Sequence, residues 1–160
     1  MAIIVTPEQL AGFIGKRLAT DGWLDIDQAR IDGFAAITGD HQFIHVDPVA
    51  ARDTPCGSTI AHGYLTLSLL PQLLEPIRLQ PKGVGWGLNY GLNRLRFLNP
   101  VPVGAAIRAT STLLAMEDKA PGRMLMRSAV TVEIRAATRP ALVAETLVMW
   151  IMDPGPTAHG

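Results

Sequence analysis

The stretch AHGYLTLSLLPQLL, residues 61–74, decides which kind of fold this chain can adopt. Read as a helix, it places leucines on every side of the helical wheel and contains no charged residue. A helix that is apolar all round has to be surrounded by protein. Pro71 is expected to kink or close it, because proline cannot donate the helical hydrogen bond. The rest of the chain must therefore supply a surface large enough to enclose this helix.

That surface is predicted in the second half of the chain. Residues 124–135 alternate between a mainly apolar and a more polar face, which is typical of a half-buried antiparallel strand. The same partial alternation predicts strands over residues 84–98, 105–116, 124–135 and 142–152, with proline-containing turns between them. The expected fold class is α+β, with a long central helix wrapped by a curved antiparallel sheet of about five strands.

The first half of the chain is predicted to be mainly helical. Thr6-Pro7-Glu8-Gln9 combines an N-cap, a first-turn proline and a glutamine that reaches back, which together indicate a helix start. A second helix is expected over Asp27–Thr38 and would end at Gly39. A strand is expected within residues 18–26, and Asp47-Pro48 is interpreted as the N-cap and first turn of another short helix.

Composition limits the function classes. A chain of 160 residues predicts one domain over residues 1–153, followed by a disordered tail at 154–160. Fourteen basic residues balance fourteen acidic ones, which argues against a nucleic-acid partner. The single cysteine, Cys56, cannot form an internal disulfide, and neither a signal peptide nor a membrane span is evident. We therefore expect a soluble cytoplasmic protein.

The ionisable side chains that could carry out catalysis are concentrated in two places, residues 39–48 (GDHQFIHVDP) and the His62-Gly63 pair. They hold the carboxylates of Asp40 and Asp47 and three of the chain's four histidines, flanked by apolar sequence. An acid and an imidazole in an apolar pocket are what proton-transfer chemistry requires. The spacings of these side chains match no recurring zinc pattern, so no metal is expected.

The motif glycine–aspartate, then an aliphatic residue and histidine before aspartate–proline, resembles that of the MaoC-like hydratases of the hot-dog fold. Gln42-Phe43 within it is similar to the NodN-like, (R)-specific enoyl-CoA hydratase branch. The resemblance implies Asp40 and His45 as the catalytic pair and the Gly63 backbone N–H as donor to the thioester carbonyl. It also implies a homodimer, an acyl-CoA substrate and no separate cofactor. A serine of some family members falls near Pro71 here, so Ser68 is the candidate substitute.

Further candidates rest on weaker signals. His62 either binds substrate, orients the catalytic loop or fills space, and Asn89 and Tyr90 either line the acyl channel or pack in the sheet. Arg94 is a candidate phosphate ligand, although charge alternating with apolar residues is equally typical of a half-exposed strand. The alternatives to hydration are a non-catalytic thioester-binding protein and an acyl-CoA thioesterase. The absence of Asp and Glu from residues 65–74, where hot-dog thioesterases place their acid, favours hydration.

Overall fold

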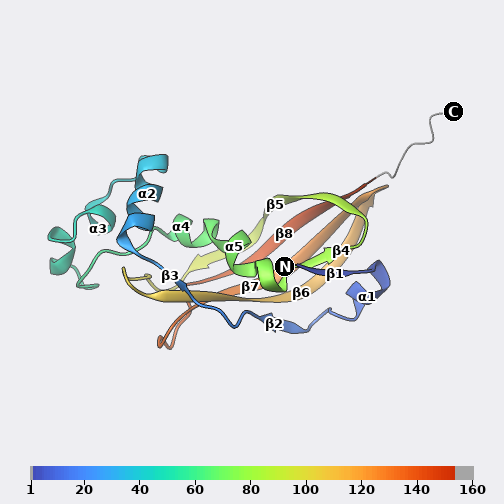
Figure 1. Ribbon diagram of the computed structural model, residues 1–160, viewed down its shortest axis with the longest axis horizontal. Coiled ribbons are helices and arrows are strands. Elements are labelled where there is room, and N and C mark those ends of the chain that lie inside the picture. The colour runs from blue at the N-terminus through green and yellow to red at the C-terminus, as the bar shows by residue number, and fades with distance from the viewer. Residues whose placement is uncertain (1, 154–160) are drawn as a thin grey trace.

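The computed structural model describes residues 2–153, and the predicted disordered tail at 154–160 lies outside the described residues. The helices precede the long strands, as predicted (Figure 1). The helices are α1 (Pro7–Ala11), α2 (Gln28–Thr38), α3 (Phe43–Val46), α4 (Gly63–Ser68) and α5 (Leu70–Leu74), with 3-10 turns η1 (Ala50–Asp53) and η2 (Glu75–Ile77). The strands are β1 (Ile3–Val5), β2 (Arg17–Ala19), β3 (Leu24–Asp25), β4 (Leu79–Pro81), β5 (Val84–Phe97), β6 (Ala106–Ala120), β7 (Arg123–Ile134) and β8 (Leu142–Met152).

The four long strands predicted from alternation, β5 to β8, are all present and pair antiparallel. They form a sheet in the order β2-β6-β7-β8-β5, with β3 also paired to β6. β6 runs to Ala120 rather than Met116, because its pairing with β7 continues up to a tight turn at Gly122, where φ is +71°. The sequence did not predict the short parallel pair of β1 and β4, whose three-residue strands lie far apart along the chain.

Helices α4 and α5 lie across one face of this sheet (Figure 1). Leu65, Leu69 and Leu73 recur every fourth residue and are buried together. The sheet side chains that complete this core cluster include Ile107, Val130, Val132 and Leu142. The predicted use of the leucine-rich segment as core is therefore confirmed.

The central helix has the break that Pro71 predicted, whereas the expectation of complete enclosure within one chain is wrong. The segment is divided at Leu69 into two short helices, and its outer side is open, with Tyr64 67% exposed and Gln72 also exposed. Pro71 explains the division, since it has no N–H to continue the helical ladder and instead occupies the first turn of α5. Neither segment, nor any other helix within residues 2–153, has the length and hydropathy needed to cross a membrane.

Local sequence signals set the ends of the early helices. The Thr6–Gln9 capping box at α1 is present, and the Asp27 side chain caps α2 by accepting from the Arg30 N–H at 2.8 Å. Gly39 ends α2 in the left-handed region, with φ at +78°, and donates its N–H to the Ala35 carbonyl. This turn reverses the chain, so α3 packs back against α2 at one end of the molecule (Figure 1).

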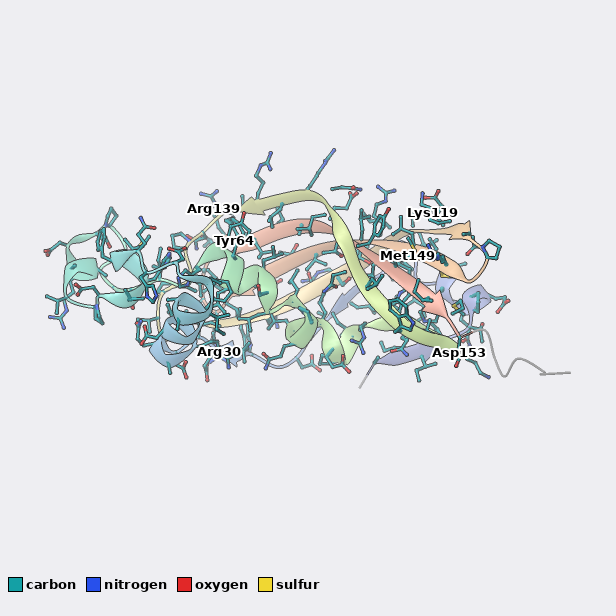
Figure 2. All side chains as sticks on the ribbon, turned by 90° about the horizontal axis from the view of Figure 1, so that it is seen from above. Arg30, Tyr64, Lys119, Arg139, Met149 and Asp153 are labelled. Atoms are coloured by element: carbon teal, nitrogen blue, oxygen red, sulfur yellow. The ribbon has the colours of Figure 1, made fainter. Side chains whose placement is uncertain are left out.

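Strand β5 forms one edge of the sheet, and Figure 2 shows it as a long band that begins near Asp153 and runs toward the end of the sheet near Tyr64 and Arg139. Only β8 pairs with it among the described residues. Several large apolar side chains of β5 are exposed to solvent, namely Trp86, Leu88, Tyr90, Leu92 and Phe97. A long apolar edge of this kind is a surface that proteins usually cover.

Polar contacts tie β5 and β7 to β8 through one carboxylate. The Asn93 amide donates to Glu145 Oε1 at 2.6 Å, and Arg127 donates to the same oxygen at 3.2 Å. These two hydrogen bonds, that of Asn93 first, hold the pKa of Glu145 below its ordinary value of 4.5.

Candidate active site

His45 is the buried imidazole of the site. It lies on the single-turn helix α3, and only 6% of it is exposed. Its Nδ1 lies 2.7 Å from the carbonyl oxygen of Ile60. Because a carbonyl can only accept, this contact requires the proton on Nδ1 and leaves the lone pair on Nε2. The fold thus fixes His45 in the tautomer that can act as a base.

Asp40 supplies the carboxylate next to this imidazole. It follows Gly39 directly and is exposed to solvent, and its Oδ1 accepts from the Gln42 N–H at 3.4 Å. A carboxylate oxygen of Asp40 and one ring nitrogen each of His45 and His62 all lie within 4.8 Å of one another. The two side chains predicted to act as a pair are therefore brought together, one reaching solvent and one buried.

His62 lies behind this pair rather than in contact with the pocket beside His45. It is 2% exposed, its ring stacks on that of His45 at a centroid distance of 3.8 Å, and Phe34 packs against it at 5.0 Å. Its Nε2 lies 3.0 Å from the backbone oxygen of Asp40, so Nε2–H donates and fixes the Asp40 backbone. This placement favours the orienting role of His62 over direct contact with a substrate.

Asp40, His45 and His62 are close enough together to suggest metal ligation, but the orientation of the rings favours proton transfer. The two imidazole rings are stacked, with planes inclined by only 27° and centroids 3.8 Å apart. A zinc ion needs nitrogens about 2.0–2.1 Å away that converge on one point. An ion in the plane of one stacked ring would lie well out of the plane of the other.

A pocket of about 300 Å³ opens beside His45. Gly63, at the first position of α4, lies in its wall, so the predicted backbone donor and the predicted base share one cavity. The first N–H groups of a helix have no partner within that helix and are free to bind an oxyanion. The ring of Phe97 covers Gly63 so closely that a Cβ there would meet three ring atoms at 3.1 Å.

The other predicted binding residues do not line this pocket. Asn89 and Ser68 belong to a separate open groove of about 820 Å³ between α5 and β5. Tyr90 and Arg94 are exposed on the edge strand. Within one chain, the structure therefore gives no support to Asn89, Tyr90, Arg94 or Ser68 as contacts of a substrate held at His45.

Sequence reasoning missed several residues that build the pocket. Thr66 and Asn99 supply polar side chains, and Phe97 supplies an aromatic wall. Phe97 and Asn99 flank the turn after β5, which was interpreted only as a separator between strands. Gln28 was also missed, although its side chain donates to the His45 carbonyl at 2.8 Å. A polar residue in the first turn of a helix ordinarily faces solvent, so its sequence position carried no signal.

Comparison with known proteins identifies the family. The model of the MaoC like domain matches residues 9–135. The chain belongs to this family. It is 45% identical over 142 residues to a 3-hydroxyacyl-thioester dehydratase Z of Mycobacterium tuberculosis, covering 89% of this chain and 93% of that one. It is 42% identical over 152 residues to Nodulation protein N of Rhizobium leguminosarum, covering 92% of each. The predicted membership of a MaoC-like, NodN-like dehydratase family, and with it the prediction of an enzyme, is confirmed.

Solved structures bear out the fold. A MaoC-like dehydratase from Rhodospirillum rubrum superposes with a TM-score of 0.73 at 22% identity, covering 94% of this chain and 99% of that one. An R-hydratase from Pseudomonas aeruginosa superposes with a TM-score of 0.67 at 24% identity, covering 88% of this chain and 83% of that one. The predicted hot-dog fold is therefore confirmed.

Proposed function

We propose that this MaoC-like protein is an (R)-specific enoyl-CoA hydratase. It would add water reversibly to trans-2-enoyl thioesters and give (R)-3-hydroxyacyl thioesters. The observation that carries this proposal is the convergence of the Asp40 carboxylate and a His45 ring nitrogen beside the pocket lined by Gly63. The named dehydratase relative at 45% identity supports the same class of reaction.

The chemistry needs two proton transfers and one anion stabiliser. As a water oxygen attacks C3 of the enoyl thioester, its proton passes to the pair formed by Asp40 and His45 Nε2, and the pair returns a proton to C2. The Nδ1–H bond to Ile60 keeps His45 Nε2 available and stabilises the ring when it takes the proton. The Gly63 N–H would stabilise the negative charge that develops on the thioester oxygen. Water and the thioester balance the reaction without any change of oxidation state, so no redox cofactor is required.

The direct test is the loss of enoyl thioester ultraviolet absorbance when the purified protein meets crotonyl-CoA. Asp40→Asn and His45→Gln should each lower kcat about 10²–10⁴-fold, the usual range for a general acid–base group. His41→Gln and Asp21→Asn are the matched controls, since both residues are exposed and lie outside the pair. Unchanged turnover in either pair variant would refute the role of that residue. Chiral chromatography of the released 3-hydroxy acid reads the stereochemistry.

The two alternatives give different results in the same assay. A thioesterase would release free thiol, which a thiol reagent detects, and a non-catalytic binder would leave the absorbance unchanged. Residues 65–74 contain no Asp or Glu, so these helical segments offer no acid for hydrolysis. Parallel assays with acyl carrier protein thioesters and with a series of chain lengths define the substrate further.

We also propose that the protein forms a homodimer through β5. The strand is a long edge with exposed apolar side chains such as Trp86 and Tyr90, and pairing with a second copy would cover both. Sedimentation should give twice the chain mass, and Tyr90→Lys should shift the population toward monomers. A monomeric wild-type protein at micromolar concentration would refute this assembly. A cytoplasmic location stays a prediction.

A further inference from the structure

We propose that Gln28, together with Thr59, is a positioning residue for His45. This inference rests on the proposed function, since it assigns Gln28 the task of holding the base of that reaction in place. Gln28 lies in the first turn of α2, outside the motif that contains Asp40 and His45.

The side-chain amide of Gln28 uses its full set of donors. Its Nε2 donates to the backbone carbonyl of His45 at 2.8 Å and to Asp32 Oδ1 at 2.8 Å. Its Oε1 accepts from the Thr59 hydroxyl at 2.5 Å. The chemistry fixes this orientation of the amide, because a carbonyl and a carboxylate can only accept, whereas the hydroxyl can donate.

The same two segments are joined again next to the imidazole. The Ile60 N–H donates to the Ile44 carbonyl at 3.0 Å, and His45 Nδ1 lies 2.7 Å from the Ile60 carbonyl. Gln28 thus bridges the backbone of His45 to Thr59, the residue immediately before the one that receives the imidazole hydrogen bond. Thr59 is only 1% exposed, so little water can replace its hydroxyl as a partner of the amide.

This arrangement controls the position of His45 Nε2. The ring is aimed by one hydrogen bond to Ile60, by its stack on His62 and by the placement of α3, which is only a single turn. Among the residues that the structure describes, removing the bridge would leave only the two hydrogen bonds of Ile60 between α3 and the Thr59-Ile60 segment, so the two could shift relative to each other. A misplacement of about 1 Å at a reacting group can lower the rate about 100-fold. The bridge therefore acts on turnover through geometry, without contact with the substrate.

The test compares kcat, KM and Tm of the full chain for Gln28→Leu, Thr59→Val and Thr59→Ser with crotonyl-CoA. Gln28→Leu should lower kcat about 10–100-fold, with KM changed less than about threefold. Thr59→Val should lower kcat about tenfold, whereas Thr59→Ser, which keeps the hydroxyl, should stay within about twofold of wild type. Gln72→Leu on the exposed side of α5 is the matched control and should leave kcat unchanged.

An activity-independent measurement separates this inference from the proposed function. In proton NMR, the His45 Nδ1–H resonance, assigned by its loss in His45→Gln, should exchange slowly with water in wild type and rapidly in Gln28→Leu and Thr59→Val. Slow exchange and full kcat in folded variants would overturn the positioning role. If Gln28→Leu does not fold, the contrast between Thr59→Val and Thr59→Ser decides. An inactive wild type would refute the hydratase proposal, and the exchange measurement would still decide whether the bridge holds His45.

Discussion

The contact between Gly63 and Phe97 gives a quantitative test of the proposed oxyanion donor. A Cβ at position 63 would lie 3.1 Å from Cγ, Cδ1 and Cδ2 of the Phe97 ring. Carbon atoms pack best about 3.5–4.0 Å apart, so the ring and the start of α4 would have to separate by about 0.5 Å. Because Cγ is among the three atoms, the ring cannot relieve the overlap by moving only its far end.

Gly63→Ala should therefore displace the backbone N–H that we propose as the donor to the thioester oxygen. Removing such a donor lowers kcat about 10²–10³-fold. We expect the partial shift to lower kcat about tenfold, which corresponds to about 1.4 kcal/mol in the activation free energy. KM should change little, because the charge on that oxygen develops in the transition state. Gly63 is not in the left-handed region and alanine favours helices, so backbone strain would not explain a loss.

The assay is the crotonyl-CoA hydration rate for Gly63→Ala, Phe97→Leu and the double variant. Leucine at position 97 removes the flat ring, so adding Gly63→Ala to Phe97→Leu should lower kcat by less than about twofold. The resulting coupling energy should be about 1 kcal/mol. An equal loss with and without the ring, or full activity in Gly63→Ala, would refute the reasoning.

Three further predictions concern stability and the support of the site. Gly87→Ala should lower the free energy of unfolding by about 1–3 kcal/mol, because the added Cβ would lie 2.6 Å from a tryptophan ring on β8. Gly91→Ala is the control: its Cβ would lie 3.8 Å from the nearest neighbour, so its free energy of unfolding in urea should stay within about 0.5 kcal/mol of wild type. His62→Phe should keep the stacking but lose the bond to the Asp40 backbone and lower kcat about tenfold; an unchanged kcat would contradict the orienting role. Because the pKa of Glu145 is lower in the folded state than its ordinary value of 4.5, the ionised carboxylate stabilises the fold at pH values above 4.5. This contribution is lost as the pH falls through the folded-state pKa. Glu145→Gln should therefore show a smaller fall in Tm on acidification than wild type, and an equal fall would contradict this linkage.

Local rules predicted the parts of the fold that depend on neighbours in sequence. The capping box at Thr6, the Asp27 cap and the Gly39 stop are hydrogen-bond and dihedral requirements satisfied within a few residues. The four long strands follow from alternation that one buried face imposes on each strand. The central helix was predicted less well, because whether Pro71 closes a helix or opens a new one depends on what packs around it.

The sequence by itself determined which chemical groups are available, since the motif at residues 39–48 and the His62-Gly63 pair bring carboxylates, imidazoles and a glycine into one short list. It also determined the fold class through the periods of its apolar residues. Only the tertiary structure decided which side chains meet. The Gln28 bridge, the His45–His62 stack and the Phe97 ring over Gly63 join residues that are 17 to 34 positions apart in the chain. No local pattern specifies such contacts, because they are set by the packing of helices and strands and not by the spacing of residues along any one element.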